Sequence, residues 1–276
     1  MHETENQYNS IASHYLTADR FGSLSESHAC ALEQIKKEQL GLNRQHFKVL
    51  DLGVGDAKFI KKINDIIPYC ELTGIDLSKE MLKKGRETLE FHDIHGDSRE
   101  ADKLLPLHMQ DLVIAHFINA YMPIQTLLKQ AKWMSKANGY FSYITSTYES
   151  FPASQTQLAQ FVAEDTFMSS IVGHYYKKIV ENTPVASGID EIVTQMHQCG
   201  FEIVNHQRIA IPIHFDSIDD MLDFGIKGTW FLNTLSAGPS TLPKQFIIER
   251  LKRFFNRIFN FPYQDEHIID VILAKK

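Results

Sequence analysis

Two glycines that directly follow an apolar run could bring bare backbone against a small charged ligand. Asp51 ends that run, at residues 47–53, and Gly53 and Gly55 follow it. Glycine adopts backbone angles that other residues avoid and lets a ligand approach the main chain. The first turn of the helix expected next would add unpaired N–H groups. A tight turn or a helix cap explains such a pair equally well, so the glycines alone do not identify a ligand.

The charges around this turn favour a cationic ligand. A dinucleotide-binding fingerprint has a third glycine where this chain has Lys58, and no acid ends its strand, because pyrophosphate is itself negative. Asp51 instead suits an ammonium or a sulfonium group. Asp76 ends the next expected strand, where its carboxylate could accept two ribose hydroxyls. The alternative role for Asp76 is to cap the helix that begins near Ser78.

The elements that must position these residues alternate in type along the chain. Short β-branched runs are followed by segments of helical period, which is typical of a parallel sheet with crossover helices. Strands are expected at 47–53, 70–77, 90–97, 110–117, 140–148, 201–211 and 267–276, and helices at 58–67, 79–89, 124–136 (closed by Asn138 and Gly139) and 188–200.

Two stretches, residues 149–187 and 212–264, show no repeated strand pattern, and no linker of low complexity divides the chain. We therefore expect one α/β domain over residues 1–276, with a Rossmann-like, seven-stranded, mostly parallel sheet and helices on both faces. A lid built from insertions should cover it, with segments at about 1–30, 149–187 and 212–264.

Composition restricts the partners. The 276 residues carry a formal net charge of -6, which gives no basic stripe for nucleic acid, so a small-molecule substrate is expected. Cys30, Cys70 and Cys199 are too far apart for a zinc knuckle or a disulfide framework. His92 and His95 fall on opposite faces of a strand, so no metal site is expected. No export signal or membrane-spanning run is recognised, and a cytoplasmic location is expected.

Taken in order, the segments VLDLGVGDAKF, LTGIDLSKEML, IHGDSREADKLL and DLVIAHFINAY resemble the motifs of the class I S-adenosylmethionine-dependent methyltransferases. The resemblance covers about residues 47–148. It implies S-adenosylmethionine as cofactor and S-adenosylhomocysteine as product. The chain departs from the family pattern at Ala57, where a glycine is usual.

The resemblance also implies roles for particular residues. The alternative role for Asp97 is to cap a helix at 98–104. Tyr8 or Tyr15 is expected to fold over the cofactor, and the alternative for them is plain helix packing. The implied cofactor contacts are Asp51, Gly53 and Gly55 at the methionine moiety, Asp76 at the ribose, Leu77 and Met81 beside the adenine, Asp97 and Ser98 at the adenine amino group, and His116 and Phe117 at the end of the fourth strand.

The segment MLDFGIKGTWFLNTL is similar to one in the trans-aconitate methyltransferase and malonyl carrier protein methyltransferase group. Lys227, the N–H that follows it and Thr229 could receive a carboxylate, unless Lys227 is simply a solvated lysine. Tyr121 and Trp230 could wall the substrate pocket or fill the core.

Methyl transfer from a sulfonium is an in-line displacement that needs alignment and exclusion of water. A carboxylate acceptor needs no general base, whereas an alcohol, phenol or amine would need one, and His116, His174 and His214 are the candidates. The catalytic candidates are therefore His116 and Lys227. We expect O-methylation of a small carboxylate. The alternatives are a lipid-like or carrier-bound acyl substrate, or a non-catalytic cofactor-binding module.

An amphipathic helix with basic residues is expected at 244–261. It could contact an acyl carrier protein, while a lid helix buried on one side is the simpler interpretation and membrane contact is not expected.

Overall fold

The computed structural model describes residues 2–12, 19–42, 46–164, 184–227 and 244–276, and all structural statements concern these residues. A seven-stranded sheet lies at the centre, in the order β3-β2-β1-β4-β5-β7-β6. β7 is antiparallel to β5 and β6, and the other neighbouring pairs are parallel. The expected fold class is confirmed. The strands are β1 (Lys48–Leu52), β2 (Glu71–Asp76), β3 (His92–His95), β4 (Gln110–His116), β5 (Ser135–Thr145), β6 (Glu202–Phe215) and β7 (Tyr263–Lys275).

Helices cover both faces of the sheet. Side chains alternate along β1, so that Val49 belongs to the core under one set of helices and Leu50 to the core under the other. Because both faces are buried, the strand is apolar at nearly every position. One face is covered by α2 (Ser23–Lys37), α3 (Lys58–Ile66) and α4 (Lys79–Thr88), and the other by α5 (Ala101–Leu104), α6 (Ile124–Met134) and α9 (Ile189–Cys199).

The boundary between α6 and β5 differs from the expectation. The helix was expected to continue to residue 136 and to close at Asn138 and Gly139, but it ends at Met134 and β5 begins at Ser135. Ser135 already pairs with Gln110 of β4, and the register then shifts. A Cβ on Gly139 would lie 3.0 Å from the Gln110 carbonyl oxygen. The lack of a side chain at Gly139 therefore allows two backbone segments to approach closely, and Gly139 does not end a helix.

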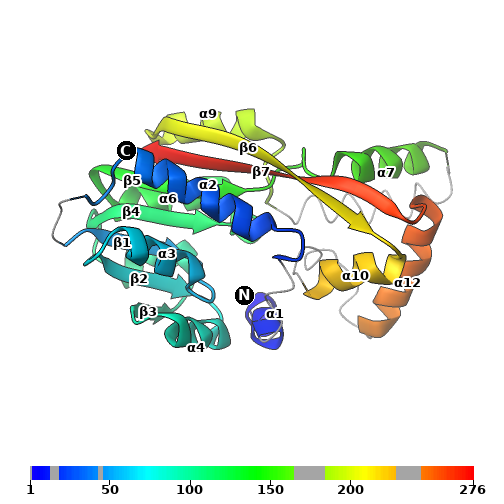
Figure 1. Ribbon diagram of the computed structural model, residues 1–276, viewed down its shortest axis with the longest axis horizontal. Coiled ribbons are helices and arrows are strands. Elements are labelled where there is room, and N and C mark those ends of the chain that lie inside the picture. Colours follow the sequence, from blue (N-terminus) through cyan, green and yellow to red (C-terminus); the bar gives the residue numbers. More distant parts are fainter. Residues whose placement is uncertain (1, 13–18, 43–45, 165–183, 228–243) are drawn as a thin grey trace.

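The last two strands are longer than expected and leave the sheet as a two-stranded ribbon (Figure 1). β5 pairs with β7 only as far as Asp270, whereas β6 and β7 stay paired out to Phe215 and Tyr263. The expectation of irregular structure through residues 212–264 was therefore wrong in part. Around the far end of the ribbon lie α7 (Pro152–Glu164), α10 (Ile218–Lys227) and α12 (Lys244–Ile258), which confirms the amphipathic helix expected at 244–261.

These three helices and the ribbon share a separate apolar core, which we call the distal cluster. Phe215 and Phe224 are almost fully buried in it, and Phe21 from the segment before α2 packs edge-on against both. Arg20 forms an ion pair with Asp220 of α10, so the N-terminal segment is attached to this part of the molecule. The described residues contain no helix that could cross a membrane.

Asp265 of β7 holds the start of α7 in place. Its carboxylate accepts the backbone N–H groups of Ala153 at 3.0 Å and Ser154 at 2.8 Å, and also the Ser154 hydroxyl at 2.6 Å. The first N–H groups of a helix lack partners within the helix, so this buried side chain replaces a local cap.

We expect Asp265→Ala to lower the free energy of unfolding by about 1–3 kcal/mol, because buried donors lose their acceptor. Equilibrium unfolding in urea, extrapolated linearly to zero denaturant, measures this change. Glu266→Ala, at the exposed neighbouring position, is the matched control and should change the free energy by less than about 0.5 kcal/mol. Equal effects of the two substitutions would contradict the assignment.

Candidate functional site

The order of strands reverses between β1 and β4, which are neighbours although β2 and β3 lie between them in sequence. In open α/β sheets, ligands bind beyond the carboxyl ends of the strands at such a point. A cleft opens there. Its lining comes from the segment before α2, α2 itself, the end of β1, the loop after it, α3 and the end of β4. The lining residues are Asp19, Leu24, Ser25, His28, Asp51, Gly53, Val54, Gly55, Asp56, Lys58, Phe59, Lys62, His116 and Phe117.

The loop after β1 has the left-handed backbone that the sequence indicated. Gly53 and Gly55 have φ angles of 98° and 55°, where a side chain costs free energy. Ala57 has a φ of 59°, which explains why a glycine is usual in its place. The N–H groups of Gly53 and Val54 both bond to the Ile75 carbonyl, at 2.8 and 3.0 Å. The loop is therefore held against the end of β2.

Asp76 fixes the same loop with its side chain. One carboxylate oxygen accepts the Gly55 N–H at 2.9 Å and the other accepts the Ser78 N–H at 2.8 Å. The helix cap itself comes from Ser78, whose hydroxyl accepts the Met81 N–H at 3.1 Å. Burial raises the pKa of Asp76, and the two backbone bonds oppose that rise.

Asp51 is buried without compensation. Its side chain is 4% exposed, and its Oδ1 atom has no hydrogen-bond partner in the described part of the chain. Burial raises the pKa of Asp51 well above its usual value, and the nearby Asp76 carboxylate raises it further. A buried carboxylate in this state is costly unless a donor or a cation meets it. The environment thus fits a positively charged ligand group.

Two histidines line the cleft side by side, with Phe59 of α3 against both. His28 of α2 and His116 at the end of β4 have ring centroids 5.4 Å apart. Burial, and then the charges of Lys62 and Lys58, lower the pKa of His28 to about 3. Burial, and then His28, lower the pKa of His116 well below its usual value. Both rings are neutral at pH 7, and such a low pKa makes His116 a weak general base.

His116 has one satisfied and one open nitrogen. Its Nε2 atom lies 3.0 Å from the Ser142 hydroxyl, whereas Nδ1 is buried and has no hydrogen-bond partner among the described residues. The next residue, Phe117, has a φ of 54°, which is unusual for a residue with a side chain and is typical of functional sites.

Residues expected at the adenine and ribose lie along the edge that continues past β2. Met81 packs beneath the loop, with its Cε atom 3.3 Å from where a Cβ on Gly55 would stand. Leu77 precedes the capping Ser78, and its carbonyl oxygen lies 3.0 Å from Nε2 of His95. These positions flank the Asp76 side chain on the outer side of the cleft.

Asp97 lies farther out, after β3, together with the buried Ser98. It accepts the Arg99 N–H at 2.9 Å, and its carboxylate also binds the Arg99 guanidinium. Burial alone would raise the pKa of Asp97, but the bonds to Arg99 outweigh it and the pKa is lowered. The capping role that the sequence left open is therefore present in the structure.

The N-terminal helix α1 (His2–Ile11) lies over the same edge (Figure 1). The Asn9 side chain accepts a hydrogen bond from the Ser78 hydroxyl at 2.7 Å, and the Tyr8 hydroxyl donates to the Tyr121 hydroxyl at 3.0 Å. Tyr8 and Tyr121 thus meet, although 113 positions separate them.

The remaining acceptor residues are described only in part. Lys227 is the last residue of α10, and its side chain lies outside the described part of the chain. Tyr15, His174, Thr229 and Trp230 lie outside the described residues. His214 packs edge-on against Phe21 in the distal part of the molecule, with ring centroids 5.5 Å apart.

Of the predicted cofactor contacts, the structure brings Asp51, Gly53, Gly55, His116 and Phe117 into one cleft. The sequence analysis did not identify two other lining residues, His28 and Lys62. Lys62 follows the glycine loop at helical spacing and could have been found from that spacing. His28 could not, because only tertiary packing brings α2 to the cleft.

Comparisons with known proteins agree with this geometry. The model of the family described as "Methyltransferase domain" matches residues 49–139, which include β1, the glycine loop, Asp76, Asp97 and His116. None of the curated proteins compared with the chain matches it in sequence.

Three solved structures share the fold. A candidate methyltransferase from Bacillus halodurans C-125 is 13% identical, with 88% of this chain and 98% of that chain covered and a TM-score of 0.54. The YcgJ protein of Bacillus subtilis is 14% identical, with 88% and 98% covered and a TM-score of 0.53. A candidate sarcosine dimethylglycine methyltransferase from Galdieria sulphuraria is 10% identical, with 90% and 85% covered and a TM-score of 0.52. The family match thus covers the loop and the strand ends that build the cleft, and the chain shares the fold of these three solved structures.

Proposed function

We propose that this protein transfers a methyl group from S-adenosylmethionine to the carboxylate of a small molecule, and that the cleft at the β1–β4 switch point holds the donor. The observation that carries this proposal is the buried Asp51 carboxylate beside the glycine loop, with Oδ1 lacking a partner among the described residues. A ligand that brings an ammonium group and a sulfonium would supply the missing donor and charge.

The placement of the donor follows the edge of the sheet from β4 to β3. The methionine end lies against Asp51, and the ribose hydroxyls reach Asp76, whose carboxylate already holds the loop. Tyr8 closes the site from α1. The proposed cofactor contacts are Tyr8, Tyr15, Asp51, Gly53, Gly55, Asp76, Leu77, Met81, Asp97, Ser98, His116 and Phe117.

The choice of acceptor is based on the two histidines in the described lining of the cleft. S-adenosylmethionine, when bound, supplies a methyl group on a good leaving group, so the chain must orient the acceptor and exclude water. Two neutral histidines of lowered pKa line the cleft and cannot readily take a proton at pH 7. A carboxylate, with a pKa of about 4, is already ionised and needs none. We place Lys227 and Thr229, with Tyr121 and Trp230, around that acceptor.

An acyl group on a carrier protein is a second candidate acceptor. The observation in its favour is α12, where Arg253 and Arg257 are exposed and lie four positions apart on one face of the helix. Their charge would suit an acidic carrier.

The acceptor class can be tested by the chemistry of the product. Purified protein with methyl-labelled S-adenosylmethionine should transfer label to a pool of small carboxylic acids, and mild base should release that label as methanol, because the product is an ester. Label found on an acyl carrier protein would favour the second candidate. Base-stable label would exclude O-methylation of a carboxylate, and cofactor binding with no transfer to any pool would indicate a binding module.

Asp76→Ala should weaken binding of S-adenosylhomocysteine by more than about tenfold, because hydrogen bonds to a charged group are worth about 1.5–3 kcal/mol each. Titration calorimetry measures the dissociation constant. Glu71→Ala, at the exposed opposite end of the same strand, is the control and should leave the constant within about twofold. Equal affinities of wild type and Asp76→Ala would argue against the proposed placement.

The affinity for S-adenosylhomocysteine should rise with pH as Asp51 ionises. In the free protein the raised pKa keeps part of this carboxyl group protonated, whereas the ligand's ammonium favours the charged form, so binding releases a proton. Calorimetry in buffers of different ionisation enthalpy measures that release.

The Asp51→Asn variant should lose the proton release and bind S-adenosylhomocysteine more weakly. It should also raise the thermal midpoint near pH 7, because a group with a raised folded-state pKa destabilises the fold above its unfolded pKa. Proton release that persists in Asp51→Asn would show that another group is responsible.

A further inference from the structure

His267 of β7 is fully buried behind the cleft and bonded through both ring nitrogens. Nδ1 lies 2.8 Å from the Ser23 hydroxyl, and Nε2 lies 2.8 Å from the Ser146 hydroxyl. Phe151 stacks on the ring at a centroid distance of 4.7 Å and an interplanar angle of 17°. One imidazole thus contacts α2, the segment after β5 and the segment before α7.

A histidine is unexpected at this position from packing alone. On the same face of β7, the following positions are Ile269, Val271 and Leu273, which belong to the aliphatic core under α2 and α3. An aliphatic residue at 267 would continue that pattern without burying polar atoms. Burial lowers the pKa of His267 to about 3, so the ring is neutral and has one donor and one acceptor nitrogen. Its two hydrogen bonds therefore fix the position of the ring relative to both serines, and neither bond involves a charged group.

Each of the two serines leads to a segment that lines the cleft. Ser23 is the first residue of α2, and the next residues, Leu24 and Ser25, line the cleft, as does His28 one turn later. Ser146 follows β5, next to the end of β4, where Phe117 lines the cleft.

The end of β4 is tied to the same segment through its backbone. The Phe117 N–H donates to the Ile144 carbonyl at 2.9 Å, and the Asn119 side chain donates to the Ser146 carbonyl at 2.9 Å. The Phe117 ring centroid lies 6.5 Å from that of His267. His267 therefore connects α2 to the end of β4, and both of these elements line the cleft.

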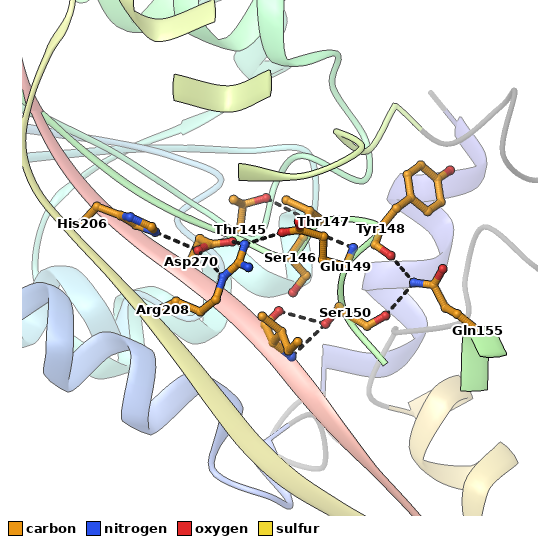
Figure 2. A network of polar contacts seen from close by, with 11 residues as sticks. Thr145, Ser146, Thr147, Tyr148, Glu149, Ser150, Gln155, His206, Arg208 and Asp270 are labelled. Carbon is orange, nitrogen blue, oxygen red and sulfur yellow. Dashed lines mark hydrogen bonds and ion pairs between the residues drawn. The ribbon is translucent and has the colours of Figure 1, made fainter. Parts of the chain in front are cut away.

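The segment that carries Ser146 is firmly attached to the ribbon (Figure 2). The Ser150 hydroxyl donates to the Ile268 carbonyl at 2.8 Å and accepts the Ile268 N–H at 2.9 Å. Arg208 of β6 pairs with the buried Asp270 at 2.9 Å and also with Glu149. Because this segment is held on both sides, the bond from His267 to Ser23 places α2 relative to a fixed platform.

We propose that His267 is a positioning residue that sets the width of the cleft by holding the first turn of α2 against the segment after β5. This rests on the proposed function in one respect, namely that the cleft binds the cofactor. His267 lies behind the lining of the cleft and acts through Ser23 and Ser146.

The test compares His267→Leu with wild type in two measurements. Calorimetry should show a dissociation constant for S-adenosylhomocysteine that is at least tenfold higher. Hydrogen exchange of the free protein should show faster exchange over residues 23–28. His267→Gln, which retains a donor and an acceptor, should restore most of the affinity and protection.

His206→Leu is the matched control. His206 is bonded to Asp270 on the opposite face of the same ribbon, at 2.8 Å. The His206→Leu variant should leave the dissociation constant for S-adenosylhomocysteine and the hydrogen exchange of α2 unchanged. This result would separate positioning from a general effect of losing a histidine of the ribbon.

Unchanged affinity and unchanged exchange in His267→Leu, with wild type binding the ligand, would overturn the proposal and leave the proposed function intact. If wild type does not bind S-adenosylhomocysteine, the proposed function fails and the exchange of α2 alone decides whether His267 positions the helix. If His267→Leu does not fold, Ser23→Ala and Ser146→Ala replace it. Their effects on α2 exchange should be non-additive, because both act through one imidazole, and additive effects would overturn the proposal.

Discussion

The bond between the Gly55 N–H and the Asp76 carboxylate, at 2.9 Å, is the contact on which the site depends. It joins the loop after β1 to the end of β2 and, with the bonds from Gly53 and Val54 to the Ile75 carbonyl, keeps the loop in its left-handed conformation. The backbone beyond β1 is then open toward α2 and β4. Because the strand order reverses here, the helices that follow β1 and β4, which are α3 and α6, cover opposite faces of the sheet.

Two buried carboxylates dominate the electrostatics near the loop. Burial raises the pKa of both Asp51 and Asp76, and the Asp76 carboxylate raises the pKa of Asp51 further. The free protein therefore stores an unfavourable interaction that a cationic ligand relieves, which is the usual cost of a preorganised site. The neutral rings of His28 and His116 add polar atoms without adding charge, and Lys58 and Lys62 bring the positive charges of the described lining.

The long β6–β7 ribbon connects this site to the rest of the molecule. Beyond the sheet it carries the distal cluster, to which the segment before α2 is attached through Phe21 and the ion pair of Arg20 with Asp220. Within the sheet it carries His267, which touches α2 and the segment after β5. The segments that line the cleft therefore contact one ribbon, and a displacement of that ribbon would displace them.

The sequence by itself determined the parts that local rules govern. Alternating apolar runs predicted the strands, and Gly53, Gly55, Asp51 and Asp76 predicted the donor side of the site, because left-handed turns and strand-end acids have signatures in residue type and spacing. The end of α6 could not be predicted, since pairing of Ser135 with β4 outweighs helix propensity. His28 and His267 carry no local signature. Only the tertiary structure, by packing α2 against β7 and the ends of β4 and β5, decided that they lie at or behind the cleft, because contacts between residues far apart in the chain depend on how whole elements pack.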